Sequence, residues 1–432
     1  MQAEEMLKSV QSRLAAMTIY DVRQVAREVR AHVTSGQKGA IIESVLNIAT
    51  GKEEPAPASK RGAPPKSERY DTRLVADVRA LRNYYLSVNN IEEPNKVAVR
   101  DSVSYYSEKE YSGYLGNDGA AYYLLAEEKL FVSDHLVLRH DLRTGDYIRC
   151  KGRKKNEAAL AGAVEILSIN GFSADEKLQR RDFSSLTHIY PEKRLVLSGS
   201  GDISQRMIDL FAPVALGQRG VVCAPVNCGK TYILKSVALG ICANYRDLEV
   251  IILTLGARPE EITEFRKSGG NFRLFYTSFD RPDEEHLAVA NVAFDYAKRC
   301  VELQKNVVIL ADGLYESLPA EAVRNYLYCA LNAEEGGSLT VIAATPQDAD
   351  VSGAANMVLN LSPALKAQRV FPAIDILNSY SSREEALLSE EELSLAVALR
   401  TKLSSGASAG EIVEYFKATD NNRSLAEMIK NG

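Results

Sequence analysis

Residues 220–245 read GVVCAPVNCGKTYILKSVALGICANY, an apolar strand, a short loop and a helical stretch in direct succession. The loop ends in Gly-Lys-Thr at 229–231, the residue types with which phosphate-binding loops meet their helix. Gly229 lets the backbone turn tightly and expose its N–H groups, Lys230 brings positive charge to terminal phosphates, and Thr231 offers a hydroxyl to Mg²⁺. This order predicts a nucleotide site; the alternative is a tight strand–helix turn that holds no ligand.

A later strand supplies the acidic partner that such a loop needs. Residues 307–312, VVILAD, place Asp312 at a strand end, where a carboxylate can help to hold Mg²⁺. We therefore expect ATP and Mg²⁺ as cofactors, with Thr231 and Asp312 as the metal ligands. The residues expected to contact the nucleotide are Pro225, Val226, Asn227, Cys228, Gly229, Lys230, Thr231, Tyr232 and Asp312.

Apolar runs at 249–255 (EVIILTL), 307–312 and 338–344 (SLTVIAA) alternate with helical stretches. Continuous apolar strands of this kind are typical of a parallel sheet covered on both faces. We expect a multidomain α/β protein in which 173–432 form the nucleotide-binding domain.

The residues before this domain change character several times. Residues 1–50 are predicted to be helical, with Val22, Val25 and Ala26 at helical spacing behind a possible N-cap at Thr18. Residues 51–69 are rich in Pro, Ala and charge and predict a disordered linker. A further helix near 70–88 precedes short alternating, tyrosine-rich segments from 103 to 170, which predict a small β-barrel, so that 70–172 form a second domain.

Composition limits the function classes. The chain has 432 residues, 46% hydrophobic and 25% charged, as in globular proteins, and a net charge of −5 argues against coating nucleic acid through bulk charge. No apolar run approaches the roughly 20 residues that span a bilayer, and the polar N-terminus does not resemble a secretory signal. The sequence thus predicts a cytoplasmic protein without a membrane partner. The six cysteines are scattered without metal-ligand spacing and predict free thiols.

Several longer sequence segments resemble those of the bacterial transcription termination factor Rho family. They are IDLFAPVALGQRGVVCAPVNCGKT (208–231), LGARPEEITEF (255–265), NAEEGGSLTVIA (332–343), QRVFPAIDILNSYSSREEALL (368–388) and LFVSDHLVLRHDLRTGD (130–146). The resemblance implies a helical N-terminal module, an OB or cold-shock-like barrel and a RecA-like ATPase domain. It also implies a hexameric ring that binds ATP and single-stranded RNA. The family likewise has alanine and proline where other phosphate loops have glycine, which accounts for Ala224 and Pro225.

The resemblance also implies RNA contacts in the barrel. Tyr114 in YSGYLG (111–116) and Phe131 match base-stacking aromatics, although Ser112 and Gly116 depart from the family's pattern. The basic run RCKGRKK (149–155) is expected on a barrel loop, where its cations would contact phosphates. The alternative is that the tyrosines are barrel core and the basic run a solvated turn. The predicted RNA contacts are Tyr114, Phe131, Arg149, Lys151 and Arg153.

Two groups that the family uses for hydrolysis are replaced. Ala257 stands where a carboxylate would orient the attacking water, and Pro363 stands where an arginine finger would be. Glu260 and Glu261 belong to the following helix start, where acidic residues complement the helix dipole, and we do not expect either to replace this carboxylate. Lys366 and Arg369 are cations near Pro363. Only Arg258 and Asp312 remain as possible catalytic residues.

The family's pore segments are shortened as well, and Asn227 stands where a lysine is usual. The segment GLYESLPAEAVRNYLYCALNA (313–333) predicts a short helical crossover in place of a longer RNA-binding loop.

We therefore expect a Rho-like termination factor, an RNA- and ATP-binding ring protein with weak or absent hydrolysis and translocation. One alternative is a fully active RNA-dependent ATPase and helicase. Another is a non-catalytic regulator that forms a mixed ring with a true Rho. RNA polymerase is a further possible partner. A third alternative is a subunit related to the F-type ATP synthase. The segments DLRTGD and RVFPAID favour the Rho family over this class.

Overall fold

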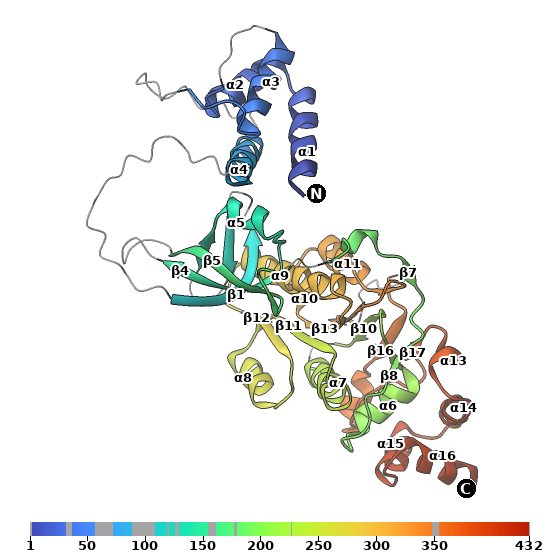
Figure 1. Ribbon diagram of the computed structural model, residues 1–432. Helices are drawn as coiled ribbons and strands as arrows, with labels where there is room; N and C mark the ends of the chain where they lie inside the picture. The colour runs from blue at the N-terminus through green and yellow to red at the C-terminus, as the bar shows by residue number, and fades with distance from the viewer. Residues whose placement is uncertain are drawn as a thin grey trace. The chain divides into compact units, whose positions relative to one another are not determined.

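The computed structural model describes residues 2–31, 37–56, 72–88, 109–117, 119, 121–125, 129–153, 161–176, 179–225, 227–347 and 354–431. The chain divides into two compact units, Met1–Leu178 and Gln179–Gly432 (Figure 1). Most of the linker predicted at 51–69 lies outside the described residues, and the domain boundaries drawn from the sequence stay predictions.

The first unit begins with four helices, α1 (Gln2–Ala16), α2 (Ile19–Glu28), α3 (Lys38–Ala49) and α4 (Thr72–Val88). Thr18 caps α2, and its hydroxyl accepts a hydrogen bond from the backbone of Asp21. Val22, Val25 and Ala26 lie on the buried face of α2, as their spacing predicts. Helix α4 shares one core with α1–α3 and also contacts helix α5 (Asp134–Arg139) of the barrel part.

The second part of this unit is a closed barrel of short strands. Its strand order is β3-β2-β1-β4-β5-β6, and a parallel pairing between β3 and β5 closes it. Alternate side chains such as Leu115, Leu124, Leu130 and Ile148 are fully buried inside. The barrel expected from the sequence is therefore present. Its elements are β1 (Lys109–Asn117), β2 (Tyr122–Leu125), β3 (Leu130–Val132), α5 (Asp134–Arg139), β4 (Tyr147–Arg153), β5 (Ala161–Ile169) and β6 (Phe172–Ser173).

The second unit is built on a mostly parallel sheet of order β12-β11-β13-β15-β10-β16-β17. The four strands β11, β13, β15 and β10 pair in parallel with their neighbours, as the apolar runs predict. Its strands are β7 (His188–Ile189), β10 (Arg219–Cys223), β11 (Glu249–Ala257), β12 (Arg273–Ser278), β13 (Asn306–Asp312), β14 (Leu331–Ala333), β15 (Ser338–Thr345), β16 (Met357–Asn360) and β17 (Tyr380–Ser381). Strands β8 (Arg194–Leu195) and β9 (Val214–Ala215) pair with each other in a separate two-stranded sheet.

Helices cover both faces of this sheet (Figure 1). One face, which includes Val222, Ile252 and Leu310, packs on α6, α7 and the C-terminal helices. The alternate residues, such as Ile251 and Ile309, are equally buried and face the other side. The helices are α6 (Ile203–Phe211), α7 (Lys230–Asn244), α8 (Pro259–Lys267), α9 (Asp283–Glu302), α10 (Leu314–Ser317), α11 (Ala320–Tyr328), α12 (Pro363–Ala367), α13 (Glu384–Leu387), α14 (Glu390–Ser404), α15 (Ala409–Lys417), α16 (Asn422–Asn431), with a 3-10 turn at Phe183–Ser185. Helices α10 and α11 form the short helical crossover expected at 313–333.

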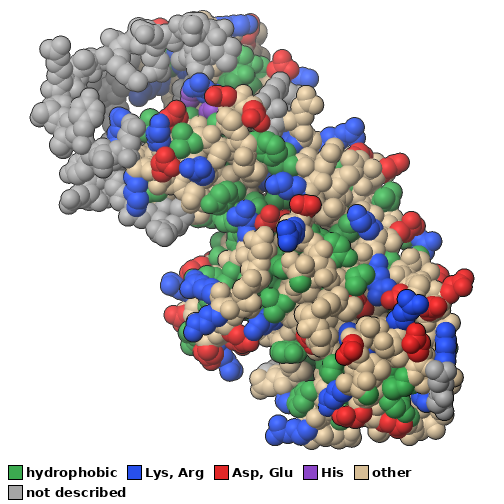
Figure 2. All heavy atoms as spheres, turned by 60° about the horizontal axis from the view of Figure 1, so that its bottom comes forward, with side chains coloured by type: hydrophobic (Ala, Val, Ile, Leu, Met, Phe, Trp, Pro, Cys, Tyr) green, Lys and Arg blue, Asp and Glu red, His purple; other side chains and the backbone are tan. Residues whose placement is uncertain are grey.

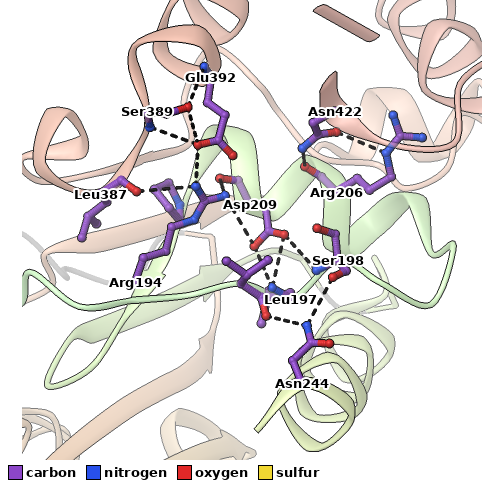
Figure 3. Close-up of polar contacts among 12 residues, drawn as sticks. Arg194, Leu197, Ser198, Arg206, Asp209, Asn244, Leu387, Ser389, Glu392 and Asn422 are labelled. Carbon is purple, nitrogen blue, oxygen red and sulfur yellow. Dashed lines mark hydrogen bonds and ion pairs between the residues drawn. The ribbon is translucent and has the colours of Figure 1, made fainter. Parts of the chain in front are cut away.

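A polar network ties the segment before α6 to the body of this unit (Figure 3). The carboxylate of Asp209 is fully buried and accepts hydrogen bonds from the backbone N–H groups of Leu197 and Ser198, at 2.9 and 2.8 Å. Arg194 donates to Glu392 of α14 at 2.8 Å, and Arg206 donates to the carbonyl of Phe416 at 2.7 Å. Buried charged groups are thus paired or hydrogen-bonded, as their desolvation requires.

The described surface carries both signs of charge. Figure 2 shows Lys and Arg side chains interspersed with Asp and Glu side chains over the face in view. Within the part of the chain that the structure describes, no helix is long and apolar enough to cross a membrane. All six cysteines are free thiols, as their scattered positions predict.

Candidate nucleotide site and RNA-binding face

The phosphate-loop segment lies between β10 and α7, in the order expected from the sequence. Gly229 is the N-cap of α7 and has φ of 91°. A Cβ there would meet no atom within 4 Å, so the glycine is required by the backbone conformation and not by lack of space. Asn227 also has a positive φ, 62°. Val226 lies outside the described residues.

The two side chains after Gly229 each contact a carboxylate. The ammonium of Lys230 donates to Glu316 of α10 with 2.9 Å between Nζ and Oε1, and the Lys230 side chain is only 11% exposed. The hydroxyl of Thr231 donates to Oδ2 of Asp312 at 2.6 Å. The structure thus brings Lys230 and Thr231 together with Asp312, although Thr231 and Asp312 are 81 residues apart in sequence.

Burial raises the pKa of the Asp312 carboxyl above its ordinary value. The hydrogen bond from Thr231 and the charge of Lys230 act in the opposite direction, while the carboxylates of Glu316 and Glu261 raise this pKa further. A divalent cation beside Asp312 would relieve this repulsion, because it adds positive charge to a site in which carboxylates outnumber ammonium groups.

The residues fit a phosphate and a Mg²⁺ ion. Loop N–H groups, the N-terminus of a 15-residue helix and an ammonium are the groups that hold phosphates. One hydroxyl and one carboxylate suffice for Mg²⁺, which keeps several waters and takes further oxygens from the phosphates. No cluster of three or more His, Cys, Asp or Glu side chains suited to a metal occurs among the described residues.

The other loop residues differ in exposure. Pro225 is half-buried and Asn227 exposed, whereas Cys228 is buried at 7% exposure. Tyr232, in the first turn of α7, is 58% exposed. The structure therefore leaves Asn227 and Tyr232 accessible beside Lys230.

Ala257 ends strand β11 and is 2% exposed. The next two carboxylates in the sequence, Glu260 and Glu261, lie at the start of α8. Glu261 accepts a hydrogen bond from the backbone N–H of Arg258 at 3.0 Å and so caps α8, while Glu260 is exposed. Both lie in the first turn of α8, as the sequence predicts, and Glu261 is already engaged. The side chain of Arg258 is exposed.

Pro363 is the first residue of α12. Proline is favoured there because its missing N–H would have no partner in the first helical turn. Ser362 caps the helix by accepting from the backbone of Leu365. Of the nearby cations, Lys366 is half-buried, whereas Arg369 is exposed and has φ of 60°.

Glu316 is a site residue that sequence reasoning missed. It lies on α10, directly after the strand that ends at Asp312, but its contact with Lys230 spans 86 residues. Local sequence does not point to this contact, because only the fold brings α10 to the phosphate loop.

The strand register of the barrel brings four aromatic rings to one outward face. Tyr114 of β1 lies opposite Tyr147 of β4, with ring centroids 5.1 Å apart, and is half-buried. Tyr123 of β2 lies opposite Phe131 of β3, at 6.1 Å, and Phe131 is 40% exposed. Lys129 lies 3.7 Å above the ring of Tyr123. Tyr123, Tyr147 and Lys129 were missed, although alternation along each strand could have indicated the two tyrosines.

The basic residues expected on a loop lie on strand β4 instead. Arg149, Lys151 and Arg153 alternate with the buried residues Cys150 and Gly152 and therefore share the outward side of the strand. The loop assignment was wrong because a run of cations resembles a polar turn.

Two of these cations have carboxylate neighbours. Arg149 pairs with Glu110 at 3.2 Å and Lys151 with Glu165 at 2.7 Å. These exposed pairs contribute little to stability, so a phosphate could replace either carboxylate at small cost.

Residues 204–327 match the model of the ATP synthase alpha/beta family, nucleotide-binding domain. Together with the sheet order and the phosphate loop, this match defines a RecA-like nucleotide-binding domain. The transcription termination factor Rho of Bacillus subtilis is 31% identical over 342 residues, which are 71% of this chain and 80% of that protein. The Rho factor of Thermotoga maritima is 36% identical over 65% of this chain and 73% of its own length. The chain belongs to the Rho family of transcription termination factors.

An ATPase from the type III secretion system of pathogenic bacteria has a similar structure, at 21% identity and a TM-score of 0.43. The similarity covers 56% of this chain and 78% of that one.

Proposed function

We propose that the protein is a Rho-like termination factor, a ring protein that binds RNA and Mg·ATP and hydrolyses ATP weakly or not at all. The observation that carries this proposal is the contrast within one site. The phosphate-binding residues Gly229, Lys230 and Thr231 are in place beside Asp312, whereas the end of β11 carries the buried methyl group of Ala257.

The phosphate-binding half of the site is supported by the arrangement around α7. The loop N–H groups and the α7 N-terminus would hold phosphate oxygens, and Lys230 would neutralise the terminal ones. Thr231 and Asp312 would hold Mg²⁺, which supplies charge compensation to the phosphates when bound. Tyr232 and Asn227, both exposed, would lie at the edge of the bound nucleotide.

The weak hydrolysis follows from what is missing. Phosphoryl transfer depends on a group that orients the attacking water and on a cation that meets the developing charge, and such an arginine finger is worth about three to five orders of magnitude in rate. Ala257 offers no hydrogen bond, and Pro363 offers no charge. Glu261 would have to leave its helix-capping bond to Arg258 before it could replace the missing carboxylate.

The RNA-binding part of the proposal rests on the outward face of the barrel. Tyr114, Tyr123 and Phe131 would stack on bases, a contact typically worth about 1–3 kcal/mol per base. Arg149, Lys151 and Arg153 of the same barrel would contact phosphates. Membership of the Rho family supports assembly into a ring, either with itself or with a catalytic Rho, and RNA polymerase as a partner of that ring.

A fully active RNA-dependent ATPase is the second candidate, and one observation favours it. Glu316 is a carboxylate 2.9 Å from the ammonium of Lys230. Because its side chain is 44% exposed and contacts Lys230, it is the described carboxylate that we propose as a substitute for the missing one.

The decisive experiment is ATP hydrolysis by the purified full chain, with and without a pyrimidine-rich RNA. The variant Lys230→Ala serves as the blank, since it removes the ammonium and should abolish nucleotide binding. No turnover above this blank, together with measurable binding of ATP by the wild type, is the expected result. RNA-stimulated turnover that Lys230→Ala removes would overturn the weak-hydrolysis proposal and establish the active enzyme.

A further inference from the structure

The ammonium of Lys230 already has an anionic partner within the chain. Its Nζ lies 2.9 Å from Oε1 of Glu316, at hydrogen-bonding distance. The Lys230 side chain is 11% exposed and that of Glu316 44%. The pair is therefore sheltered on the lysine side and open to solvent on the glutamate side.

The helix that carries Glu316 is held firmly against the sheet. Gly313 is the N-cap of α10 with φ of 80°, and a Cβ there would lie 2.1 Å from the carbonyl oxygen of Leu255. Leu314 is fully buried and Leu318 is 8% exposed. Since both ends of α10 are fixed, Glu316 remains near Lys230 even when its side chain rotates.

This placement has a consequence for phosphate binding. The lysine of a phosphate loop reaches the β- and γ-phosphates, whereas the loop N–H groups hold the α- and β-phosphates. Two anions that contact the same ammonium lie within about 6 Å of each other, because each contact is about 3 Å long. At the dielectric of a protein surface, such a repulsion weakens binding by about ten- to hundredfold.

We propose that Glu316 competes with the terminal phosphate for Lys230 and makes this site favour a nucleoside diphosphate over a triphosphate. The inference rests on the proposed nucleotide site and deepens it. A diphosphate keeps the loop and helix contacts and brings less negative charge to Glu316. A triphosphate must either displace the carboxylate or bind beside it.

The test is the affinity of the full chain for ADP and for a non-hydrolysable ATP analogue, measured by calorimetry with Mg²⁺. For the wild type we expect ADP to bind at least about tenfold more tightly than the analogue. In Glu316→Gln, which keeps the shape and removes the charge, we expect this preference to shrink by about tenfold or more. The gain should come mainly from tighter binding of the analogue.

Glu321→Gln is the matched control, because Glu321 is an exposed carboxylate in the first turn of the neighbouring helix α11. Its ratio of the two affinities should stay within about twofold of the wild type. Glu316→Ala is the second variant, and it should change the ratio in the same direction as Glu316→Gln.

Three results would overturn the inference. If the wild type binds the ATP analogue more tightly than ADP, the inference is refuted by this measurement alone. Equal ratios in the wild type and Glu316→Gln, with both nucleotides bound, refute the role of Glu316 but leave the nucleotide site intact. Absence of binding of either nucleotide by the wild type and both variants removes the proposed nucleotide site itself.

Discussion

Replacing Asp209 by alanine should destabilise the second unit strongly. The carboxylate is fully buried and accepts from the backbone N–H groups of Leu197 and Ser198 (Figure 3). Alanine leaves both donors without this acceptor, and each buried group that loses its partner costs about 1–3 kcal/mol. We therefore expect the free energy of unfolding to fall by about 2–5 kcal/mol. Arg194 keeps its contact with Glu392, so the charge of Arg194 adds no comparable cost.

The assay is urea unfolding followed by circular dichroism, because the chain has no tryptophan. A loss of this size should lower the midpoint of the transition of the second unit by roughly 1 M or more. Asp209→Asn keeps one acceptor oxygen and should lie between alanine and the wild type. Asp247→Ala removes an exposed carboxylate and is the control that should not change the midpoint. A change below about 1 kcal/mol in Asp209→Ala would refute the reasoning.

The pH dependence of this effect has a definite sign. Burial raises the pKa of Asp209, although the donors at Leu197 and Ser198 and the charge of Arg194 oppose the shift. A carboxyl with a raised pKa binds its proton more tightly in the folded state. Its contribution to stability is therefore fully present below the unfolded pKa of 3.8 and declines as pH rises through the raised folded value. The wild type should lose stability relative to Asp209→Asn over this interval.

Three further predictions concern the sites. Lys230→Ala should weaken binding of a fluorescent ATP analogue at least about a hundredfold, because the variant loses the charge-assisted contact between the ammonium and the phosphates. Unchanged binding would refute the assignment of a nucleotide site. Gly229→Ala should destabilise the loop by about 1–2 kcal/mol, since φ of 91° strains any side chain, and unaltered thermal unfolding would contradict this. Tyr123→Ala and Phe131→Ala should each lower RNA affinity by about 5- to 150-fold and keep a steep salt dependence. Tyr20→Ala, which removes an exposed tyrosine of α2, is the control, and an equal loss in that variant would refute the stacking face.

Local sequence was sufficient to predict those features that depend on neighbouring residues alone. The strand, loop and helix around Gly229 follow from residues next to each other, as does the cap at Thr18. The strand position of Arg149 was missed because the run from Arg149 to Lys155 was judged by its positive charge alone. The alternation of basic residues with apolar or small ones, of which Cys150 is buried, is instead typical of a strand. A Cβ at Gly152 would lie 2.7 Å from the ring of Tyr111, so this glycine serves packing and not a turn.

Other features depend on contacts between distant segments. The Lys230–Glu316 pair and the placement of α4 on the N-terminal helices depend on which surfaces meet after folding. Neither charge pattern nor helical periodicity carries that information. The face formed by Tyr114, Tyr123 and Phe131 depends in the same way on strand register, because a shift by one residue would turn every ring inward.

Because Ala257 replaces a carboxylate that hydrolysis needs, it changes what sets the occupancy of the nucleotide site. In a motor, occupancy of the site is set by how fast each molecule is consumed and released. A site that binds without turnover comes to equilibrium with its surroundings, so its occupancy follows the free concentrations of the nucleotides. In the function proposed for this chain, the second unit would therefore read the energy state of the cell without consuming ATP.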